Sequence, residues 1–409
     1  MTSRGALSAA ALCVLIGGVG RFSAQGVPAP KLGTVLPLPY TAGNDAIWGA
    51  TGQDARGHIW FGISVTGLTP NTARLVEYVP DTGQFIERGD VVGELRRLSL
   101  LRPEEEQAKI HSKIVPGPGG YLYFSSMDEK GENENGSKLP IWGGHLWRLS
   151  LTTNRWEHLL RVPEALIAVG VGGRFVYTLG YFGHVVYQYD TQTGRTARLQ
   201  VGSVDGHISR NFLVDARGHA YVPRLTAETT PQGRKVTVSL VEFDTDLAEI
   251  HATPIPPEEY FGSNSPTDAH GIVGIQQMAD GSLAFTTHAG RLFKITPPTQ
   301  SQGGADVADL GWIHPAGPSY PASLFTSDGK TELFTLALLR GKVWEWTRCT
   351  WPNVACVASP LGLTGYPDGP PSMLLYGSST RDSRGGHYVV GMGPGYRPIV
   401  LRIPESTNP

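Results

Sequence analysis

The sequence predicts an all-β protein built from a repeated unit of about four short strands. Glycine and proline are abundant, with 52 and 31 residues among 409, and long amphipathic helical patterns are nearly absent. Short stretches of alternating apolar and polar residues, rich in Tyr, Phe and Val, recur between Asp-Gly or Gly-Gly turns. This composition and this repetition are typical of all-β repeat folds.

The repetition divides the chain into seven units with a common order of strands and turns. Each unit has roughly 35 to 55 residues, the period expected of β-propeller blades. The units span Ile47–Val91, Lys109–Val162, Ala165–Gly202, His207–Ile255, His270–Ile313, Tyr320–Leu361 and Met373–Pro404. The sequence therefore predicts a seven-bladed β-propeller of four-stranded antiparallel blades, with six or eight blades as alternatives.

Two segments outside this pattern bear on the count of blades. The seventh unit has only three strands, and we expect Gly33–Leu38 to supply its outer strand and close the ring, which removes open sheet edges. The charged stretch Leu95–Gln107 fits no blade, so we expect a short helical or irregular excursion there. One propeller domain is expected over residues 25–409.

The N-terminus has the layout of a secretory signal peptide. Arg4 precedes an apolar run from Ala6 to Val19, and a polar stretch follows, so residues 1–24 are expected to be removed. The predicted location is extracellular or periplasmic. In that oxidising compartment the two remaining cysteines, Cys349 and Cys356, are expected to form a disulfide.

Charge and hydropathy restrict the partners. The net charge of −2 gives no reason to expect nucleic acid or an anionic membrane surface as a partner. No segment after the leader reaches the length of a membrane span. We expect a monomer that binds a small or polymeric ligand.

Ligand sites of propellers usually lie on the face that carries the loops into each inner strand and the loops between second and third strands. Polar side chains collect at both positions in this sequence. The histidines, tyrosines and arginines expected on that face are His111, His145, Tyr181, His184, His207, Arg210, Arg224, His270, His288 and Tyr320. We predict a functional site there.

Histidine, tyrosine and arginine together suit β-elimination from a uronic acid sugar. Arginine can hold the carboxylate and stabilise the enolate-like intermediate, while a neutral imidazole and a phenol exchange protons with the sugar. Hydrolysis is less well supported, because no pair of carboxylates flanks this face; Asp268 is alone there.

The stretch KIHSKIVPGPGGYLYFSS, followed by GGHLWRLSL, resembles secreted bacterial seven-bladed propeller polysaccharide lyases of the ulvan lyase type. It is similar, more distantly, to oligogalacturonate lyases. The resemblance implies a catalytic group of two histidines, a tyrosine and an arginine. These match His111, His145, Tyr181 (with Tyr187 as second choice) and Arg210. The substrate it implies is an anionic, uronate-containing polysaccharide.

Metal and function remain open at the sequence level. The elimination as proposed needs no cofactor, although Zn²⁺, Mn²⁺ or Ca²⁺ could bind with ligands that the sequence does not identify. The alternatives are a metal-dependent propeller lyase acting on a substrate other than a uronate, and a non-catalytic propeller that binds a ligand or a protein.

Overall fold

The computed structural model describes residues 29–39, 45–204, 206–207, 209–264, 268–298, 303–339, 343–364, 373–395 and 397–405. The predicted signal peptide, residues 1–24, lies outside the described residues. The fold is all-β: the described helices are α1 (Val91–Arg97), α2 (Pro257–Phe261) and the 3-10 turn η1 (Pro118–Gly120).

The first units form separate antiparallel sheets. Unit one comprises β2 (Thr51–Gln53), β3 (Ile59–Val65), β4 (Thr72–Val79) and β5 (Gln84–Asp90). Unit two comprises β6 (Lys109–Ile110), β7 (Val115–Gly117), β8 (Tyr121–Asp128), β9 (Gly143–Ser150) and β10 (Trp156–Val162). Unit three comprises β11 (Leu166–Gly172), β12 (Phe175–Gly180), β13 (Val185–Asp190) and β14 (Thr196–Gln200).

The next units repeat the pattern. Unit four comprises β15 (Leu213–Val214), β16 (Ala220–Thr230), β17 (Gly233–Phe243) and β18 (Glu249–Ile255). Unit five comprises β19 (Ile272–Gln277), β20 (Leu283–Thr287), β21 (Arg291–Thr296) and β22 (Asp306–Trp312).

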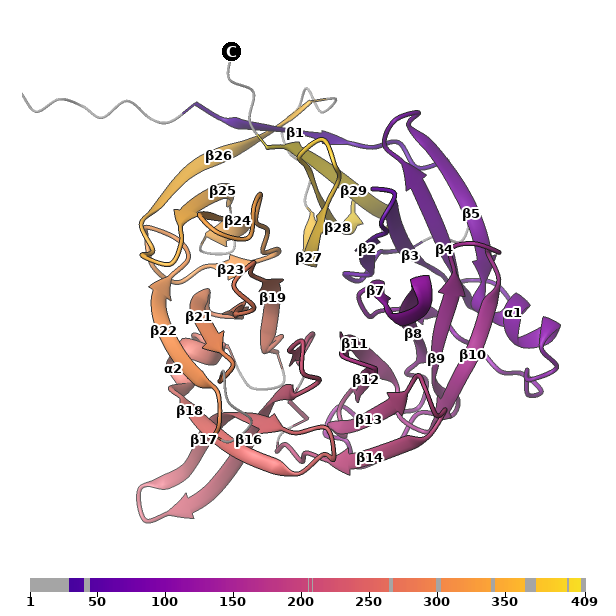
Figure 1. The fold of residues 1–409 in the computed structure, drawn as a ribbon, viewed down its shortest axis with the longest axis horizontal. Helices are drawn as coiled ribbons and strands as arrows, with labels where there is room; N and C mark the ends of the chain where they lie inside the picture. The colour runs from indigo at the N-terminus through magenta and orange to yellow at the C-terminus, as the bar shows by residue number, and fades with distance from the viewer. Residues whose placement is uncertain are drawn as a thin grey trace, which may run out of the picture.

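The last two units share one eight-stranded sheet. Unit six comprises β23 (Tyr320–Pro321), β24 (Glu332–Leu339), β25 (Val343–Thr350) and β26 (Cys356–Thr364). Unit seven comprises β27 (Leu374–Arg381), β28 (Gly386–Gly393) and β29 (Arg397–Pro404). Figure 1 shows the units standing around a common centre, with β2, β7, β11, β19 and β27 nearest to it.

The N-terminal strand β1 (Lys31–Val35) joins units six and seven. It pairs in antiparallel fashion with β29, opposite Arg402 and Leu401, and in parallel fashion with β26. The expected pairing of the N-terminal strand with the last unit is therefore confirmed. The first and last described strands lie side by side, as Figure 1 shows.

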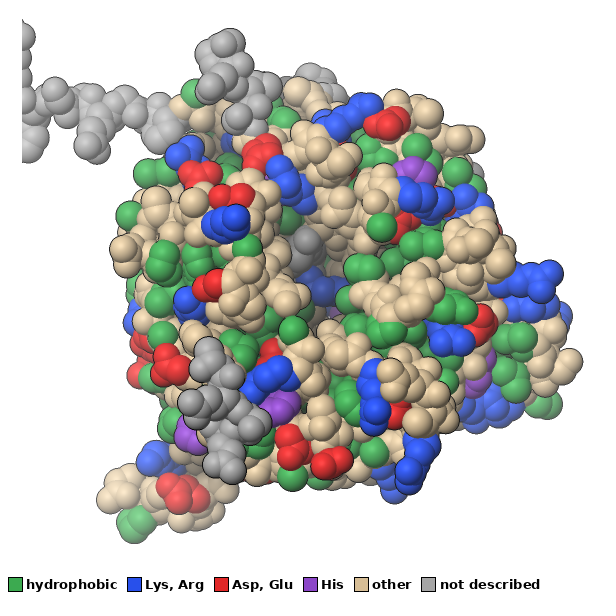
Figure 2. Space-filling model, viewed as in Figure 1, with side chains coloured by type: hydrophobic (Ala, Val, Ile, Leu, Met, Phe, Trp, Pro, Cys, Tyr) green, Lys and Arg blue, Asp and Glu red, His purple; other side chains and the backbone are tan. Residues whose placement is uncertain are grey.

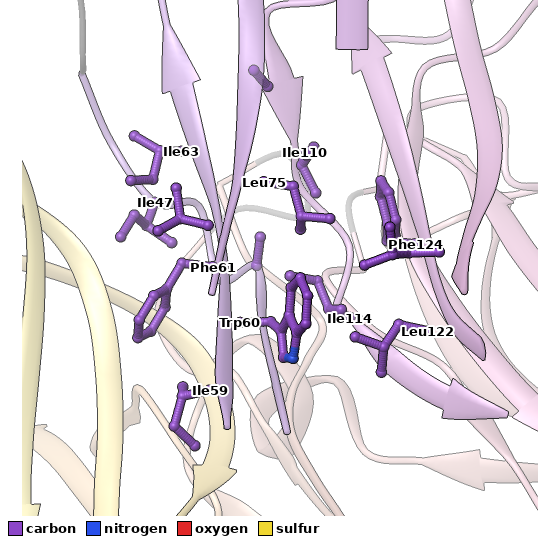
Figure 3. Packing of buried hydrophobic residues seen from close by; sticks show 14 of the residues in the cluster. Ile47, Ile59, Trp60, Phe61, Ile63, Leu75, Ile110, Ile114, Leu122 and Phe124 are labelled. Carbon is purple, nitrogen blue, oxygen red and sulfur yellow. The ribbon is translucent and has the colours of Figure 1, made fainter. Parts of the chain in front are cut away.

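Neighbouring units pack through apolar side chains and glycines. Trp60 of β3 is fully buried in a cluster that contains apolar side chains of units one, two and seven (Figure 3). A Cβ at Gly62 would lie 2.6 Å from Ile110, and one at Gly52 would lie 1.9 Å from the carbonyl oxygen of Ile114. Glycine is required at both positions because the two units approach so closely.

Two further expectations can be compared with the structure. The excursion between units one and two contains α1, which begins at Val91, earlier than the sequence suggested, and is N-capped by Asp90. The disulfide Cys349–Cys356 is present and joins paired positions of β25 and β26. Within the described residues, no helix is long and apolar enough to cross a membrane.

Deletion of Lys31–Val35 tests the role of β1. Its loss leaves β26 and β29 with unpaired backbone groups, and we expect the free energy of unfolding to fall by about 3 to 6 kcal/mol, at roughly 1 kcal/mol per lost hydrogen bond. Urea denaturation measures this. Leu32→Ser is the matched control, because Leu32 is 55% exposed and its change leaves the strand pairing intact. Equal stability of the deletion and the control would contradict the role assigned to β1.

Candidate functional site

Eight side chains gather where the innermost strands begin, and we call them the central cluster. They share a position at the start of an inner strand or in the loop between second and third strands. Its members are Trp48, His111, Tyr181, Arg210, His270, His288, Tyr320 and Tyr376. Because the inner strands stand around one centre, residues far apart in sequence meet there.

Arg210, just before β15, is the hub of the central cluster. Its Nη1 lies 3.5 Å from Nε2 of His111 and 3.5 Å from the carbonyl oxygen of Trp48, and its Nη2 lies 3.2 Å from Nε2 of His270. The guanidinium also stacks on Tyr376, 4.6 Å from the ring centroid. All of these partners are neutral groups.

The charge of Arg210 has no counter-ion among the described residues. None of its hydrogen bonds there goes to a carboxylate, and its Nε has no hydrogen-bond partner. Nε and Nη2 form the edge of a guanidinium that binds a carboxylate side-on. Arg210 therefore has the donors for an anionic ligand, in a half-buried position where a charge pair is stronger than in water.

The histidines around Arg210 are held neutral. Burial, and then the Arg210 charge, lower the pKa of His111 and of His270 well below the ordinary value. Burial, followed by Arg210, lowers the pKa of His288 to about 4. Neutral imidazoles at pH 7 can accept protons, so the central cluster contains bases and no protonated histidine.

The hydrogen bonds of His270 fix its tautomer. Because a guanidinium can only donate, Nε2 of His270 accepts from Arg210, and the ring proton is then on Nδ1. Nδ1–H donates to the hydroxyl oxygen of Tyr320 at 3.3 Å. His288 accepts the backbone N–H of His270 on its Nδ1, at 2.9 Å. Arg210, His270 and Tyr320 therefore form one directed chain.

The tyrosines remain protonated. Burial raises the pKa of Tyr320 to about 12, and burial also raises the pKa values of Tyr181 and Tyr376, against the opposing effect of the nearby Arg210 charge. A phenol of this kind donates a proton or a hydrogen bond and does not serve as a base at neutral pH.

Two cavities adjoin the central cluster. One of about 10 Å³, lined in part by His111, Lys113 and Arg210, has room for about one water-sized group. The other, about 440 Å³, is lined at one end by His270, His288, Tyr320 and Tyr376. A ligand larger than a few atoms therefore has space on the His270 side. Figure 2 shows a face that is hollowed at its centre, with Lys or Arg side chains visible inside.

Six of the ten predicted site residues belong to the central cluster. They are His111, Tyr181, Arg210, His270, His288 and Tyr320. Trp48 and Tyr376 also belong to it and were missed. Both occupy the inner-strand position of units one and seven, for which the sequence analysis named no residue, so the same positional rule could have found them.

His145 belongs to a different network. It lies inside β9, is fully buried, and its ring nitrogens contact His158 (2.9 Å) and Glu105 (3.0 Å). Glu105 also forms ion pairs with Arg102 and Arg161. Burial raises the pKa of Glu105, but the hydrogen bonds from His145 and Arg102 lower it to about 2. A histidine with both nitrogens engaged and no exposed surface is poorly placed as the catalytic histidine predicted from sequence.

The other predicted residues also lie apart. His184 and His207 are fully buried with ring centroids 4.8 Å apart and planes tilted by 53°, and a ring nitrogen of His207 lies 3.1 Å from the hydroxyl of Tyr260. Arg224 forms a surface ion pair with Glu249. Tyr187, the second choice for the tyrosine, lies in β13 and donates to Glu164. None of them has a described contact with Arg210.

One group of described residues has the spacing of a metal site, but arginine side chains of the protein already form ion pairs with its carboxylates. Asp54, His58 and Glu77 place ligand atoms within 4.8 Å of one another. Arg56 forms ion pairs with both carboxylates, and Arg88 with Glu77. Unit four repeats the arrangement with Asp215, Arg217, His219 and Glu242. We interpret it as a structural motif of the turn between first and second strands.

Comparison with known proteins finds solved structures with a similar fold but identifies no family. No protein-family model matches the chain, and no curated protein matches its sequence. Solved structures with a similar fold include the extracellular domain of a chain described as a hybrid two-component system of B. thetaiotaomicron, with a TM-score of 0.53 at 13% identity. Another is PorZ, a bacterial surface component of the type-IX secretion system of Porphyromonas gingivalis, with a TM-score of 0.52 at 10% sequence identity.

The alignments cover 93% and 90% of this chain, but only 40% and 48% of the two known chains. The chain thus corresponds to less than half of each of these larger proteins. Identities this low indicate a shared fold and carry no information about shared activity.

Acid should destabilise this protein through its neutral histidines. Burial lowers the pKa values of His158, His184 and His288 to about 4 and that of His387 to about 3. The unfolded chain binds protons at these groups below about pH 6.5, so stability falls as the pH drops from about 6.5 to 4. Burial raises the pKa of Glu132 to about 8 and also raises the pKa values of Asp45, Asp128 and Glu259, and these carboxyl groups oppose the trend.

Between pH 7 and pH 5 we expect the free energy of unfolding, measured by urea denaturation, to fall by several kcal/mol summed over these groups. The urea midpoint should fall with it. A midpoint that is constant over this range would contradict the neutral, buried state of these histidines.

The division between structural and site histidines predicts that two matched substitutions lower the stability by different amounts. His145→Ala leaves the Glu105 carboxylate buried without one of its donors, and we expect it to lower the free energy of unfolding by about 2 to 4 kcal/mol. His111 is neutral and has no described hydrogen bond to a carboxylate. We therefore expect His111→Ala to lower the free energy of unfolding by less than about 1.5 kcal/mol. Urea denaturation of both variants checks this, and equal losses would contradict the assignment.

Proposed function

We propose that this chain is a secreted seven-bladed β-propeller whose ring is closed by β1 between units six and seven. The seven strand groups, the pairing of β1 with β26 and β29, and the position of the groups around one centre support this assignment. The disulfide between Cys349 and Cys356 supports export, because such bonds persist in oxidising compartments.

We propose further that the central cluster binds the carboxylate of a uronic acid sugar and eliminates across its C4–C5 bond. The observation that carries this proposal is the guanidinium of Arg210, which is held by two neutral histidines and an aromatic ring and has no described counter-ion. A carboxylate on Nε and Nη2 would supply that counter-ion and make the C5 proton more acidic.

Binding of the carboxylate would also prepare the base. Nε2 of His270 now accepts from Nη2 of Arg210. A carboxylate that takes this N–H releases the Nε2 lone pair, and its negative charge raises the pKa of the imidazole. His270 is a better base than His111, because His270 is half-buried and lines the larger cavity, while His111 is 5% exposed and lines the water-sized one.

The protons balance within the Arg210–His270–Tyr320 chain. His270 takes the C5 proton on Nε2, the C4=C5 double bond forms, and the C4–O bond breaks. Tyr320 gives its hydroxyl proton to the leaving oxygen. The imidazolium then returns a proton from Nδ1 to the Tyr320 oxygen, 3.3 Å away. Both residues are neutral again, and His270 now carries its proton on Nε2. Loss of that proton to solvent and uptake of one on Nδ1 restore the starting tautomer before the next turnover.

The test is the ultraviolet absorbance of the new double bond while the protein acts on a panel of uronate polymers. Arg210→Ala should lower kcat/KM about 10³-fold, and His270→Ala and Tyr320→Phe should each lower it about 10²- to 10⁴-fold. Arg224→Ala, an arginine of the surface, is the matched control and should change the rate less than twofold.

Activity that survives His270→Ala but not His111→Ala would move the base to His111. Uronate binding that depends on Arg210, without any product, would identify a non-catalytic carboxylate-binding propeller. The absence of both binding and product across the panel would contradict the proposed function.

A further inference from the structure

The cavity of about 440 Å³ beside the central cluster has two kinds of lining. The rings of His270, His288 and Tyr320 of the central cluster form one part of its wall. The rest of the wall is mostly apolar. They include Phe261, Ala289, Pro318, Leu338, Trp344, Leu374 and Leu375. We call this second part the apolar cleft.

The apolar cleft is poorly suited to a hydroxyl-rich sugar ring. The polar side chains that line it are Ser263, Asn264 and Ser319. Each sugar hydroxyl placed there without a partner would lose its hydrogen bonds to water and weaken binding. An apolar group has no such cost and removes the cleft surface from water. Leu374, 53% exposed at this cavity, would be covered by such a group.

The walls also indicate the shape of the group. Phe261, Tyr320, Trp344 and Tyr376 place aromatic rings around the cavity, and aromatic rings pair well with one another in stacked or edge-on geometry. A cavity of about 150 Å³ is enough to bind benzene, so the cleft has room for a substituted aryl group.

The cleft adjoins the proposed carboxylate site through two side chains, although Arg210 itself does not line it. His270 lines the cavity and lies 3.2 Å from Nη2 of Arg210, and Tyr376 lines it and also contacts the Arg210 guanidinium with its ring. A ligand whose carboxylate reaches Arg210 beside these two rings would place its remaining atoms at the cleft.

We propose that this site takes an aryl-substituted uronate, with the carboxylate at Arg210 and the aryl group in the apolar cleft beside Trp344. The inference rests on the carboxylate site of the proposed function and specifies its ligand. Trp344 is half-buried on β25, opposite Leu338 of β24, where a bound aryl ring would alter its fluorescence.

The experiment compares three probes by calorimetric titration and by tryptophan fluorescence: glucuronate, 4-nitrophenyl glucuronide and 4-nitrophenyl glucoside. We expect the aryl glucuronide to bind at least about tenfold more tightly than glucuronate, from burial of the ring. It should also bind at least about tenfold more tightly than the aryl glucoside, which lacks the carboxylate for Arg210.

Three variants test whether the cleft causes the tighter binding of the aryl glucuronide. Trp344→Ala should remove most of the preference for the aryl glucuronide over glucuronate while leaving glucuronate affinity within about twofold. Leu374→Ser, at an exposed position that is not expected to disturb folding, should reduce the preference about threefold. Val343→Ala is the matched control, because Val343 is 50% exposed and does not line the cleft.

Equal affinity for glucuronate and its aryl glycoside would overturn the inference and leave the carboxylate site standing. An aryl glucoside that binds as tightly as the aryl glucuronide would show that the cleft acts without Arg210, which also overturns it. If neither carboxylate probe binds, both the proposed function and this inference fail.

Discussion

The positive charge of Arg210, which is half-buried where the inner strands meet and has no described counter-ion, is the feature on which the account of the site depends. Moving a charge out of water costs free energy unless other groups replace its hydration. Here the replacements are two imidazole nitrogens, a carbonyl oxygen and the face of Tyr376. Burial keeps the neighbouring histidines neutral, and the same charge lowers their pKa values further, so Arg210 bears on both the anion affinity and the supply of bases.

The fold explains why these groups meet and why other histidines do not take part. The inner strands stand around one centre, whatever their separation along the chain, and side chains at their starts contact one another. Residues one strand further out face neighbouring sheets and the excursion after β5. His145 meets Glu105 there, and His58 and His219 meet Glu77 and Glu242 in the turn motif. In those networks the histidine forms a hydrogen bond to a buried carboxylate, so that ring nitrogen is not available to a ligand.

Much of the fold could be predicted because the turns repeat. The seven units begin and end close to the predicted residues, and the partner of β1 and the disulfide were predicted correctly. The site was predicted less well. The motif GGHLW suggested that His145 lies at a strand start, but the chain turns at Gly143 (φ 71°), so His145 is already inside β9. Which face of a strand a side chain occupies depends on this register, and one residue of error changes it.

The central claim is that the Arg210 charge, together with burial, keeps His111 and His270 neutral and that Arg210 binds a carboxylate. NMR titration of the histidine rings tests it most directly, in the wild-type protein and in Arg210→Met, which keeps much of the side-chain length without the charge. The account predicts that the pKa values of His111 and His270 rise in Arg210→Met, and that glucuronate raises them in the wild-type protein but not in the variant. Histidine titrations that respond neither to the substitution nor to glucuronate would contradict it.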